Sequence, residues 1–301
     1  LYCAAPCRLK IAQAHRGITT LIEPIALAGL TGLAVGSFLN VVIHRLPVRL
    51  GLVTPSSLDG PREDTALASH DPPGLIQPAS HCPQCGTPLN WRENIPLVSF
   101  IIQKGRCRHC NTRISWRYPA VELLSALISM VVAIVLGTQW FTVPALLFSW
   151  ALIVLAFIDI EHYLLPDAIT LPLLWLGLLV NCFAGFTTPQ AAIIGAGAGY
   201  LGLWLVYHVF RWITSREGFG YGDFKMLAAI GAWLGWALLP LVLCIAATVG
   251  AITGGLMMLI SRSGRGRVLP FGPFLAGAAW LVLLFGDSFI SAYLLTSGLG
   301  R

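Results

Sequence analysis

Eight apolar stretches, each close to the length that a helix needs to cross a membrane, limit what this chain can fold into. The hydrocarbon core of a bilayer is about 30 Å thick, and an α-helix of about 20 apolar residues crosses it. The 301 residues are 56% hydrophobic and only 11% charged, with a mean hydropathy of +0.76, which is too apolar for an ordinary soluble domain. We therefore predict an all-α polytopic membrane protein with about eight transmembrane helices, over residues 21–43, 119–137, 141–158, 168–186, 190–210, 224–238, 240–260 and 271–294.

These stretches divide the chain into four regions. Residues 1–20 are predicted to be an N-terminal extension, and residues 21–43 the first transmembrane helix. Residues 44–118 form the one extended polar segment, whose Pro-, Ser- and Asp-rich part at 55–74 predicts a flexible linker or surface loop. The remaining region, 119–296, holds seven helices, and the short stretch 224–238 could tilt or break at its glycines, Gly231 and Gly235.

Lysines and arginines predict the orientation, because cytoplasmic loops of membrane proteins carry an excess of them. The 44–118 segment holds nine: Arg45, Arg49, Arg62, Arg92, Lys104, Arg106, Arg108, Arg113 and Arg117. The alternate short connections near 138–140, 187–189 and 239 hold none. This pattern places the polar segment, the 159–167 turn and the 218–225 loop on the cytoplasmic side, with both termini outside. The net charge of +6 then reflects anchoring to anionic lipid, and no nucleic-acid partner is expected.

Two pairs of cysteines in the polar segment predict a metal site. Cys82 and Cys85 form one C-x2-C pair, and Cys107 and Cys110 form another after 21 intervening residues. Two such pairs can supply four thiolates to one tetrahedral zinc ion, and a reducing cytoplasmic face favours zinc over the alternative of disulfides or free thiols. His81 and His109 are adjacent alternative ligands that we expect only to flank the pairs. Four cysteines leave no position for a catalytic water, so the predicted zinc is structural.

Acidic residues at the ends of apolar stretches are the candidates for chemistry. Asp159 ends an apolar run, where the helix macrodipole disfavours an anion, and a carboxylate held there is a functional candidate. Asp167 follows Pro166 at the start of the next stretch, and its side chain suits a helix N-cap. Glu122 lies near the start of another stretch, where it would favour the helix N-terminus.

The sequence GFGYGDFK at 218–225 presents a second candidate, Asp223. An N-cap at the start of the following helix is one interpretation of Asp223. However, a helix cap does not require three glycines, and this loop has Gly218, Gly220 and Gly222. In addition, Asp159 is predicted on the same membrane face. Two aspartates at one face can share a proton, one acting as general base and the other as general acid. Lys225 could bias this pair toward ionisation or anchor to lipid headgroups.

The ordered motifs resemble a known family. Gly220-Tyr221-Gly222-Asp223 matches the signature of the GxGD membrane aspartyl proteases, and Asp159 followed by LLPD is similar to their first aspartate motif. GSFLNVVIHRLP at 36–47, the paired-cysteine loop and LPFGPFLAGAA at 269–279 resemble one branch, the bacterial type IV prepilin peptidases. The archaeal preflagellin peptidases are a second resemblance, although they generally lack the cysteine loop.

The resemblance implies an enzyme of the bacterial inner membrane with its active site facing the cytoplasm. It implies cleavage of the basic leader of prepilins or pseudopilins, and N-methylation of the new N-terminus with S-adenosylmethionine. Asp159 and Asp223 would be the catalytic pair, with Gly220, Gly222 and Lys225 in the supporting loop, and the four cysteines would bind zinc. No residue pattern indicates the methyl-donor site, an oligomeric state, or the choice between pilins and pseudopilins.

Two alternatives remain open from the sequence. One is a GxGD protease without methyltransferase activity. The other is a transporter that uses Asp159 and Asp223 as proton or cation sites, although these acids are predicted at one face and not at the midplane. Cleavage of a prepilin by the purified protein discriminates between the transporter and the peptidases.

Overall fold

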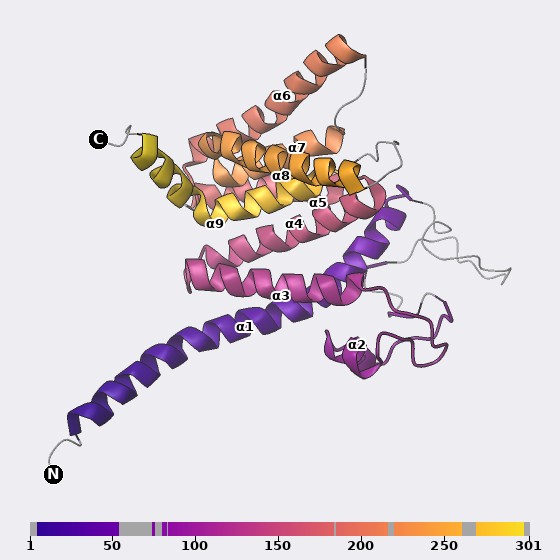
Figure 1. Cartoon of the computed structure of the whole chain (residues 1–301), viewed down its shortest axis with the longest axis vertical. Helices are drawn as coiled ribbons and strands as arrows, with labels where there is room; N and C mark the ends of the chain where they lie inside the picture. Colours follow the sequence, from indigo (N-terminus) through magenta and orange to yellow (C-terminus); the bar gives the residue numbers. More distant parts are fainter. Residues whose placement is uncertain are drawn as a thin grey trace. The chain divides into compact units, whose positions relative to one another are not determined.

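The fold is all-helical over the residues that the computed structural model describes, 5–53, 74–75, 80–82, 84–183, 185–215, 220–260 and 269–297 (Figure 1). The predicted linker at 55–74 lies almost wholly outside these residues. So do residues 1–4 of the predicted extension and Gly218.

Each predicted apolar stretch contains one helix, which confirms the predicted fold class. The helices are α1 (Ala5–Arg49), α3 (Arg117–Leu136), α4 (Thr142–His162), α5 (Asp167–Cys182), α6 (Pro189–Thr214), α7 (Tyr221–Leu234), α8 (Leu239–Ile260) and α9 (Gly272–Ser297). Two shorter elements lie in the polar segment, the 3-10 helix η2 (Trp91–Asn94) and the one-and-a-half-turn helix α2 (Val98–Ile102). A further 3-10 turn, η3 (Trp236–Leu238), precedes α8.

Among the described residues, five helical segments are long and apolar enough to cross a membrane, so this is a multi-pass membrane protein. They are Glu23–Arg49, Arg117–Leu136, Thr142–His162, Pro189–Thr214 and Trp236–Ile260. Two shorter apolar helices are Asp167–Cys182 and Gly272–Gly286. Helix α7 has 14 residues and is therefore only about 21 Å long, because Gly235 ends it with φ of 78°. The expected break in stretch 224–238 is confirmed at Gly235, whereas Gly231 lies inside the helix.

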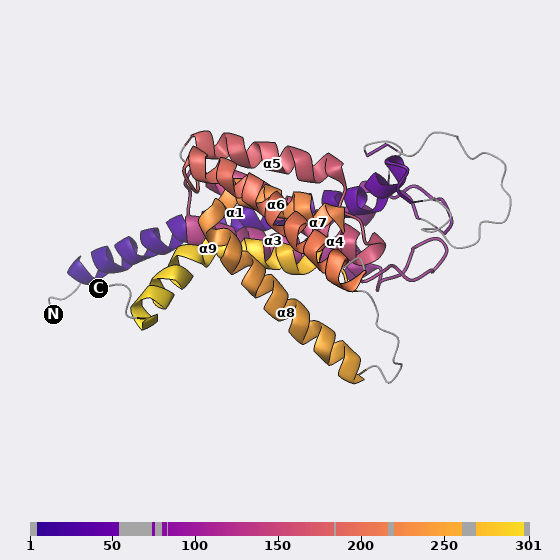
Figure 2. The same ribbon diagram turned by 90° about the horizontal axis from the view of Figure 1, so that it is seen from above.

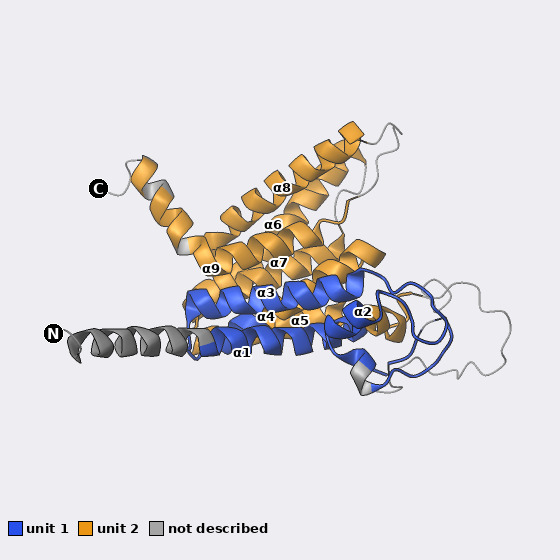
Figure 3. Cartoon of the chain, turned by 60° about the horizontal axis from the view of Figure 1, so that its bottom comes forward, with its two compact units in different colours: residues 1–42, 55–146 blue, residues 43–54, 147–301 orange. Residues whose placement is uncertain are grey.

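The chain divides into two compact units (Figure 3). Unit 1 comprises residues 1–42 and 55–146, and unit 2 comprises residues 43–54 and 147–301. The helix α1 continues from the residues predicted as an extension through the first span and past residue 43, so the backbone shows no break at the boundaries predicted from hydropathy.

In unit 1, small residues let α1 and α3 approach closely. A Cβ atom added at Gly32 would lie 2.6 Å from Ser129 Oγ, and one added at Gly36 would lie 2.8 Å from the Cα of Glu122. Small residues four apart are a common way for membrane helices to pack. The buried Asn40 side chain reinforces this contact, because its Nδ2 donates a 3.0 Å hydrogen bond to the Tyr118 carbonyl.

In unit 2, α7 is the central helix. Its residues from Phe224 to Leu234 are buried except Lys225, because α5, α6, α8 and α9 all contact it (Figures 1 and 2). The ring of Trp233 fills the middle of this core, where its Nε1 donates a 2.9 Å hydrogen bond to the Leu173 carbonyl of α5. The packing of a polytopic bundle around one short, buried helix fixes both ends of that helix.

Gly195 and Gly231 make the closest approach between α6 and α7. A Cβ atom at Gly195 would overlap the Gly231 carbonyl oxygen, and a Cβ atom at Gly231 would overlap the Gly195 carbonyl oxygen. Because both obstacles are backbone atoms, a side chain at either position forces the two helices apart. These glycines therefore set the distance between α6 and α7.

We expect Gly195→Ala to destabilise the protein by about 1–3 kcal/mol, since overpacking a tight contact costs this much. The measurement is thermal unfolding in detergent. Gly197→Ala is the matched control, because Gly197 lies on the same helix with no atom within 4 Å of its added Cβ, and alanine favours the helix. Equal unfolding temperatures for the two variants would contradict this account of the contact.

Candidate functional site

Two equivalent turns in unit 1 hold the four cysteines. In the first, the Cys82 N–H donates to the Thr87 carbonyl and the Gly86 N–H donates to the Cys82 carbonyl. In the second, the Cys107 N–H donates to the Thr112 carbonyl and the Asn111 N–H donates to the Cys107 carbonyl. Both turns need a residue with positive φ after the second cysteine, which Gly86 supplies at 68° and Asn111 at 58°. The local sequences CPQCGT and CRHCNT thus encode the same knuckle twice.

The four sulfur atoms meet in one cluster. All of them lie within 4.8 Å of one another, with 3.8 Å between the Sγ atoms of Cys82 and Cys110 and 4.0 Å between those of Cys85 and Cys107. A tetrahedral ion with metal–sulfur bonds of about 2.3 Å separates its sulfurs by about 3.8 Å. The residues therefore fit a four-coordinate metal ion, and neither His81 nor His109 belongs to the cluster.

The surroundings of the thiols also suit metal binding. The hydrogen bond with the Thr112 hydroxyl lowers the pKa of the Cys110 thiol to about 6, and the Thr87 hydroxyl likewise lowers the pKa of Cys85. Burial raises the pKa of Cys82 to about 12, so a thiolate there requires a cation beside it. Thr87 and Thr112 are therefore candidates for supporting the metal ligands. The spacing of the cysteines alone does not indicate them.

Glu122 connects the polar segment to α3. Its carboxylate accepts a 2.8 Å hydrogen bond from the Leu97 N–H, at the start of α2. Leu97 has φ of 58°, an unfavourable conformation for a leucine, and this bond helps to hold it. The prediction that Glu122 serves the N-terminus of its own helix is wrong, because its carboxylate caps a turn that lies 25 residues earlier in the chain.

In unit 2, Asp159 lies three residues before the end of α4 and is 6% exposed. Its Oδ2 accepts a 2.9 Å hydrogen bond from the Gly272 N–H, the first residue of α9. A helix N-terminus stabilises an anion. The unfavourable position at the C-terminal end of α4 is therefore offset by the favourable end of α9. A Cβ atom at Gly272 would lie 2.6 Å from the same carboxylate oxygen, so this approach requires glycine.

Asp223 is the third residue of α7 and is 8% exposed. Its Oδ2 accepts a 3.1 Å hydrogen bond from the Gly220 N–H, so the carboxylate serves the N-terminus of its own helix. The N-cap position itself belongs to Gly220, which corrects the interpretation of Asp223 as the cap. Asp159 is close enough to Asp223 for their charges to repel each other.

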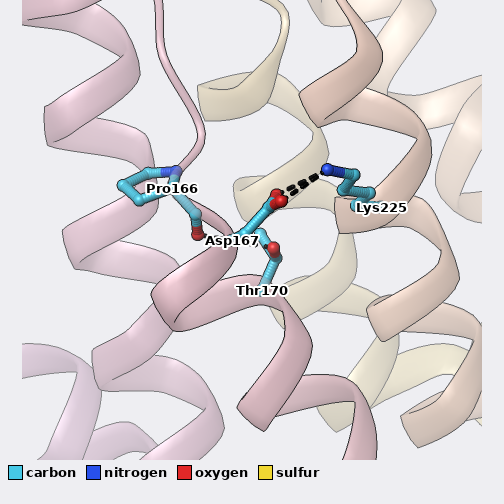
Figure 4. Close-up of polar contacts among 4 residues, drawn as sticks. All are labelled: Pro166, Asp167, Thr170 and Lys225. Carbon is cyan, nitrogen blue, oxygen red and sulfur yellow. Dashed lines mark hydrogen bonds and ion pairs between the residues drawn. The ribbon is translucent and has the colours of Figure 1, made fainter. Parts of the chain in front are cut away.

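Asp167 and Lys225 form an ion pair that was not predicted (Figure 4). Lys225 Nζ donates to both carboxylate oxygens of Asp167, over 2.7 and 2.6 Å. The N-cap of α5 is Pro166, so the prediction that Asp167 caps this helix is wrong. The Lys225 ammonium bonds to Asp167 and to neither Asp159 nor Asp223. Neither of these two buried aspartates forms an ion pair with a described residue.

Gly272 is the functional residue that the sequence interpretation missed. The motif LPFGPF belongs to the family resemblance, which implies no role for its glycine. A glycine followed by proline is a detectable signal of a helix start, because proline favours the first turn, and every helix start has unpaired N–H groups. Its partner 113 residues earlier in the chain is not detectable from local pattern.

The fold and the sites define a multi-pass helical membrane protein that has two buried aspartates in unit 2 and a cysteine cluster suited to a metal ion in unit 1. Comparisons with known proteins agree with this class. Residues 30–136 match the bacterial peptidase A24 N-terminal domain, and residues 146–255 match the type IV leader peptidase family. The chain belongs to the type IV leader peptidase family.

Similar proteins share most of their length with this chain. A protein of Aeromonas salmonicida is 49% identical over 279 residues, covering 90% of this chain and 94% of that protein. One from Pseudomonas aeruginosa is 45% identical and covers 89% of this chain and 93% of its own length. One from Burkholderia pseudomallei is 44% identical and covers 91% of this chain and 88% of its own length. All three are named prepilin leader peptidase/N-methyltransferase. No solved structure matches the chain significantly.

We expect the purified protein to carry about one metal ion per chain, and the double variant Cys82→Ser/Cys107→Ser to lose it, because each knuckle then keeps only one thiolate. Elemental analysis after gel filtration measures this. The control is Cys182→Ser/Cys244→Ser, which changes two cysteines outside the cluster. A metal content that is unaffected by the first variant, or lost equally in both, would contradict the assignment.

Proposed function

We propose that this protein is a prepilin leader peptidase of the bacterial inner membrane that also N-methylates the new N-terminus. Its substrates are type IV prepilins or type II secretion pseudopilins, cleaved at the cytoplasmic face. The names of the similar proteins support both activities. The observation that carries the proposal is the pair of buried aspartates, each held by a backbone N–H at the start of a helix.

The cytoplasmic orientation rests on charge. The connections predicted to be cytoplasmic carry the lysines and arginines, and the α3–α4, α5–α6 and α7–α8 connections carry none. Asp159 lies in the last turn of α4 and Asp223 in the first turn of α7, so both belong to the predicted cytoplasmic side. A basic leader ahead of an apolar helix stays on that side by the same rule. The scissile bond and the aspartates thus meet at one membrane border.

The two aspartates divide the work of peptide hydrolysis. The ionised aspartate removes a proton from water, which attacks the scissile carbonyl carbon, while the protonated aspartate donates its proton to the carbonyl oxygen. The tetrahedral intermediate collapses by breaking the C–N bond, and the leaving amine takes up a proton. In each aspartate Oδ2 is held by a backbone N–H, and Oδ1 accepts no hydrogen bond from any described residue. Each Oδ1 is therefore available to water or substrate.

Zinc is the metal that best suits the cysteine cluster, because zinc accepts four thiolates in a tetrahedral arrangement. Cys82, Cys85, Cys107 and Cys110 would hold it. When bound, it supplies a crosslink between the two knuckles and takes no part in the cleavage. The polar segment around the cluster has few buried apolar side chains, among them the cysteines Cys82 and Cys107, so a metal crosslink replaces a hydrophobic core there.

Asp159→Asn and Asp223→Asn should each lower leader removal by about a thousandfold or more, since each removes one partner of the general acid–base pair. The assay incubates the detergent-purified protein with a prepilin and follows the loss of the leader by mass spectrometry. Asp167→Asn is the comparison, because an acid that is partly exposed and paired with Lys225 should lower leader removal by no more than about fivefold. Full processing by the Asp159→Asn variant would refute the pair, as would an Asp167→Asn variant that is equally inactive.

We further propose that the methyl donor binds in an open hollow on unit 1. This hollow of about 1320 Å³ lies beside the second knuckle. Its wall includes the rings of Phe100 and Trp116, which lie 5.0 Å apart and can stack on adenine. Arg106 and Arg113, which pair as an antiparallel β-bridge, suit the donor's carboxylate. When bound there, S-adenosylmethionine supplies the methyl group.

The variants Arg106→Ala and Trp116→Ala should raise the donor concentration needed for half-maximal methylation by about tenfold, the effect of losing one charge-assisted hydrogen bond or one stacking contact. Leader removal should stay unchanged. Mass spectrometry measures leader removal and methylation in one reaction, because the lost leader and the added methyl group are separate mass changes. Unchanged methylation at limiting donor would place the donor elsewhere in the protein.

A further inference from the structure

The Asp167–Lys225 ion pair joins the two segments that carry the buried aspartates. Asp167 is the first residue of α5, and only the short connection 163–166 separates α5 from α4, which ends near Asp159. Lys225 lies in the first turns of α7, two residues after Asp223. Figure 4 shows the lysine side chain reaching from α7 to the start of α5, with both carboxylate oxygens of Asp167 facing its ammonium group.

A second contact brings the same two segments together. A Cβ atom at Gly222 would lie 2.7 Å from the Cβ of Leu165, so the first turn of α7 rests directly on the α4–α5 connection. That connection is itself tightly turned, because Tyr163 has φ of 55° and its N–H donates a 2.9 Å hydrogen bond to the Asp159 carbonyl. The position of Asp223 relative to Asp159 therefore depends on how α7 is seated on this turn.

We propose that Lys225 and Asp167 act together as a clamp that positions Asp223 against Asp159 for the reaction. Both are positioning residues, since the ammonium and carboxylate groups engage each other and neither aspartate of the catalytic pair. This inference rests on the proposed function, because the arrangement that the clamp favours is the one in which the two aspartates share a proton. The clamp also gives Asp167, which is near Asp159 in sequence, a role other than that of a second general base.

The exposure of the clamp limits how strongly it can act. The side chains of Lys225 and Asp167 are 31% and 52% exposed, so solvent screens their attraction. An exposed ion pair shifts an equilibrium by no more than about fivefold. Breaking the clamp can therefore lower the population of the active arrangement by about that factor, and it leaves substrate binding unchanged.

Lys225→Met and Asp167→Asn should each lower kcat for leader removal by about fivefold, with KM unchanged. Lys225→Arg keeps the charge and the donors, and should restore kcat to within about twofold of the parent protein. Arg49→Met is the matched control, since Arg49 is an exposed cation of unit 2 that forms no ion pair with a described residue. It should leave kcat unchanged. All variants are compared as full-length protein in the same detergent.

The double variant Asp167→Asn/Lys225→Met tests whether the two residues act as a pair. If they do, its kcat equals that of either single variant, whereas independent roles would multiply the losses to about 25-fold. Salt gives a second test, because raising ionic strength screens an exposed pair. The kcat of the parent protein should then fall toward that of the double variant, which itself should not change.

Several outcomes would overturn the clamp. A loss above about a hundredfold in Lys225→Met, or a raised KM, would mean that Lys225 touches the substrate. A loss below twofold in both single variants, or multiplied losses in the double variant, would mean that the pair does not position Asp223. Amide hydrogen exchange at residues 220–226 gives a readout independent of activity, and it should quicken in the double variant. If the parent protein cleaves no prepilin but exchange still quickens, the proposed function fails while the contact between the segments stands.

Discussion

The contact of each buried aspartate with the N-terminus of a helix is the interaction on which the packing around Asp159 and Asp223 depends. A charge inside an apolar bundle is costly unless fixed dipoles replace the water around it. Asp159 accepts a hydrogen bond from the N–H of Gly272 at the start of α9. Asp223 accepts one from the N–H of Gly220 at the start of its own helix. Because each carboxylate needs a helix to begin beside it, the starting points of α7 and α9 cannot move without cost. The same donors bond to Oδ2 of each aspartate and not to Oδ1.

The described glycines of GFGYGDFK make separate contacts. Gly220 is the N-cap whose N–H meets Asp223, and Gly222 lets the first turn of α7 rest on Leu165. Gly218 lies outside the described residues. Further along α7, the backbone of Gly231 contacts the backbone of Gly195 in α6. The glycines that the structure describes therefore allow close packing, which holds a short helix in place at several points.

The sequence predicted well those features that repeat locally or depend on length. Hydropathy located α1 and α3 to α9 among the described residues, because a span needs a minimum number of apolar residues. Cysteine spacing predicted the cluster, because each knuckle is a local turn. It failed where partners are distant in the chain. Gly272 lies 113 residues from Asp159, and Lys225 lies 58 residues from Asp167. Local rules assigned Asp167 to a helix cap, and tertiary packing paired it with a lysine instead.

Burial and exposure serve different purposes at this site. The backbone contact between α6 and α7 is buried and admits no side chain, so it sets where α7 lies but cannot respond to conditions. The pair of Asp167 and Lys225 is partly exposed and weak, so it can open and close at little cost. The proposed hydrolysis needs a peptide to enter between the two carboxylates, and both properties are compatible with that requirement. The buried contact fixes α7 against α6, whereas the partly exposed pair lies at the end of α7 that carries Asp223.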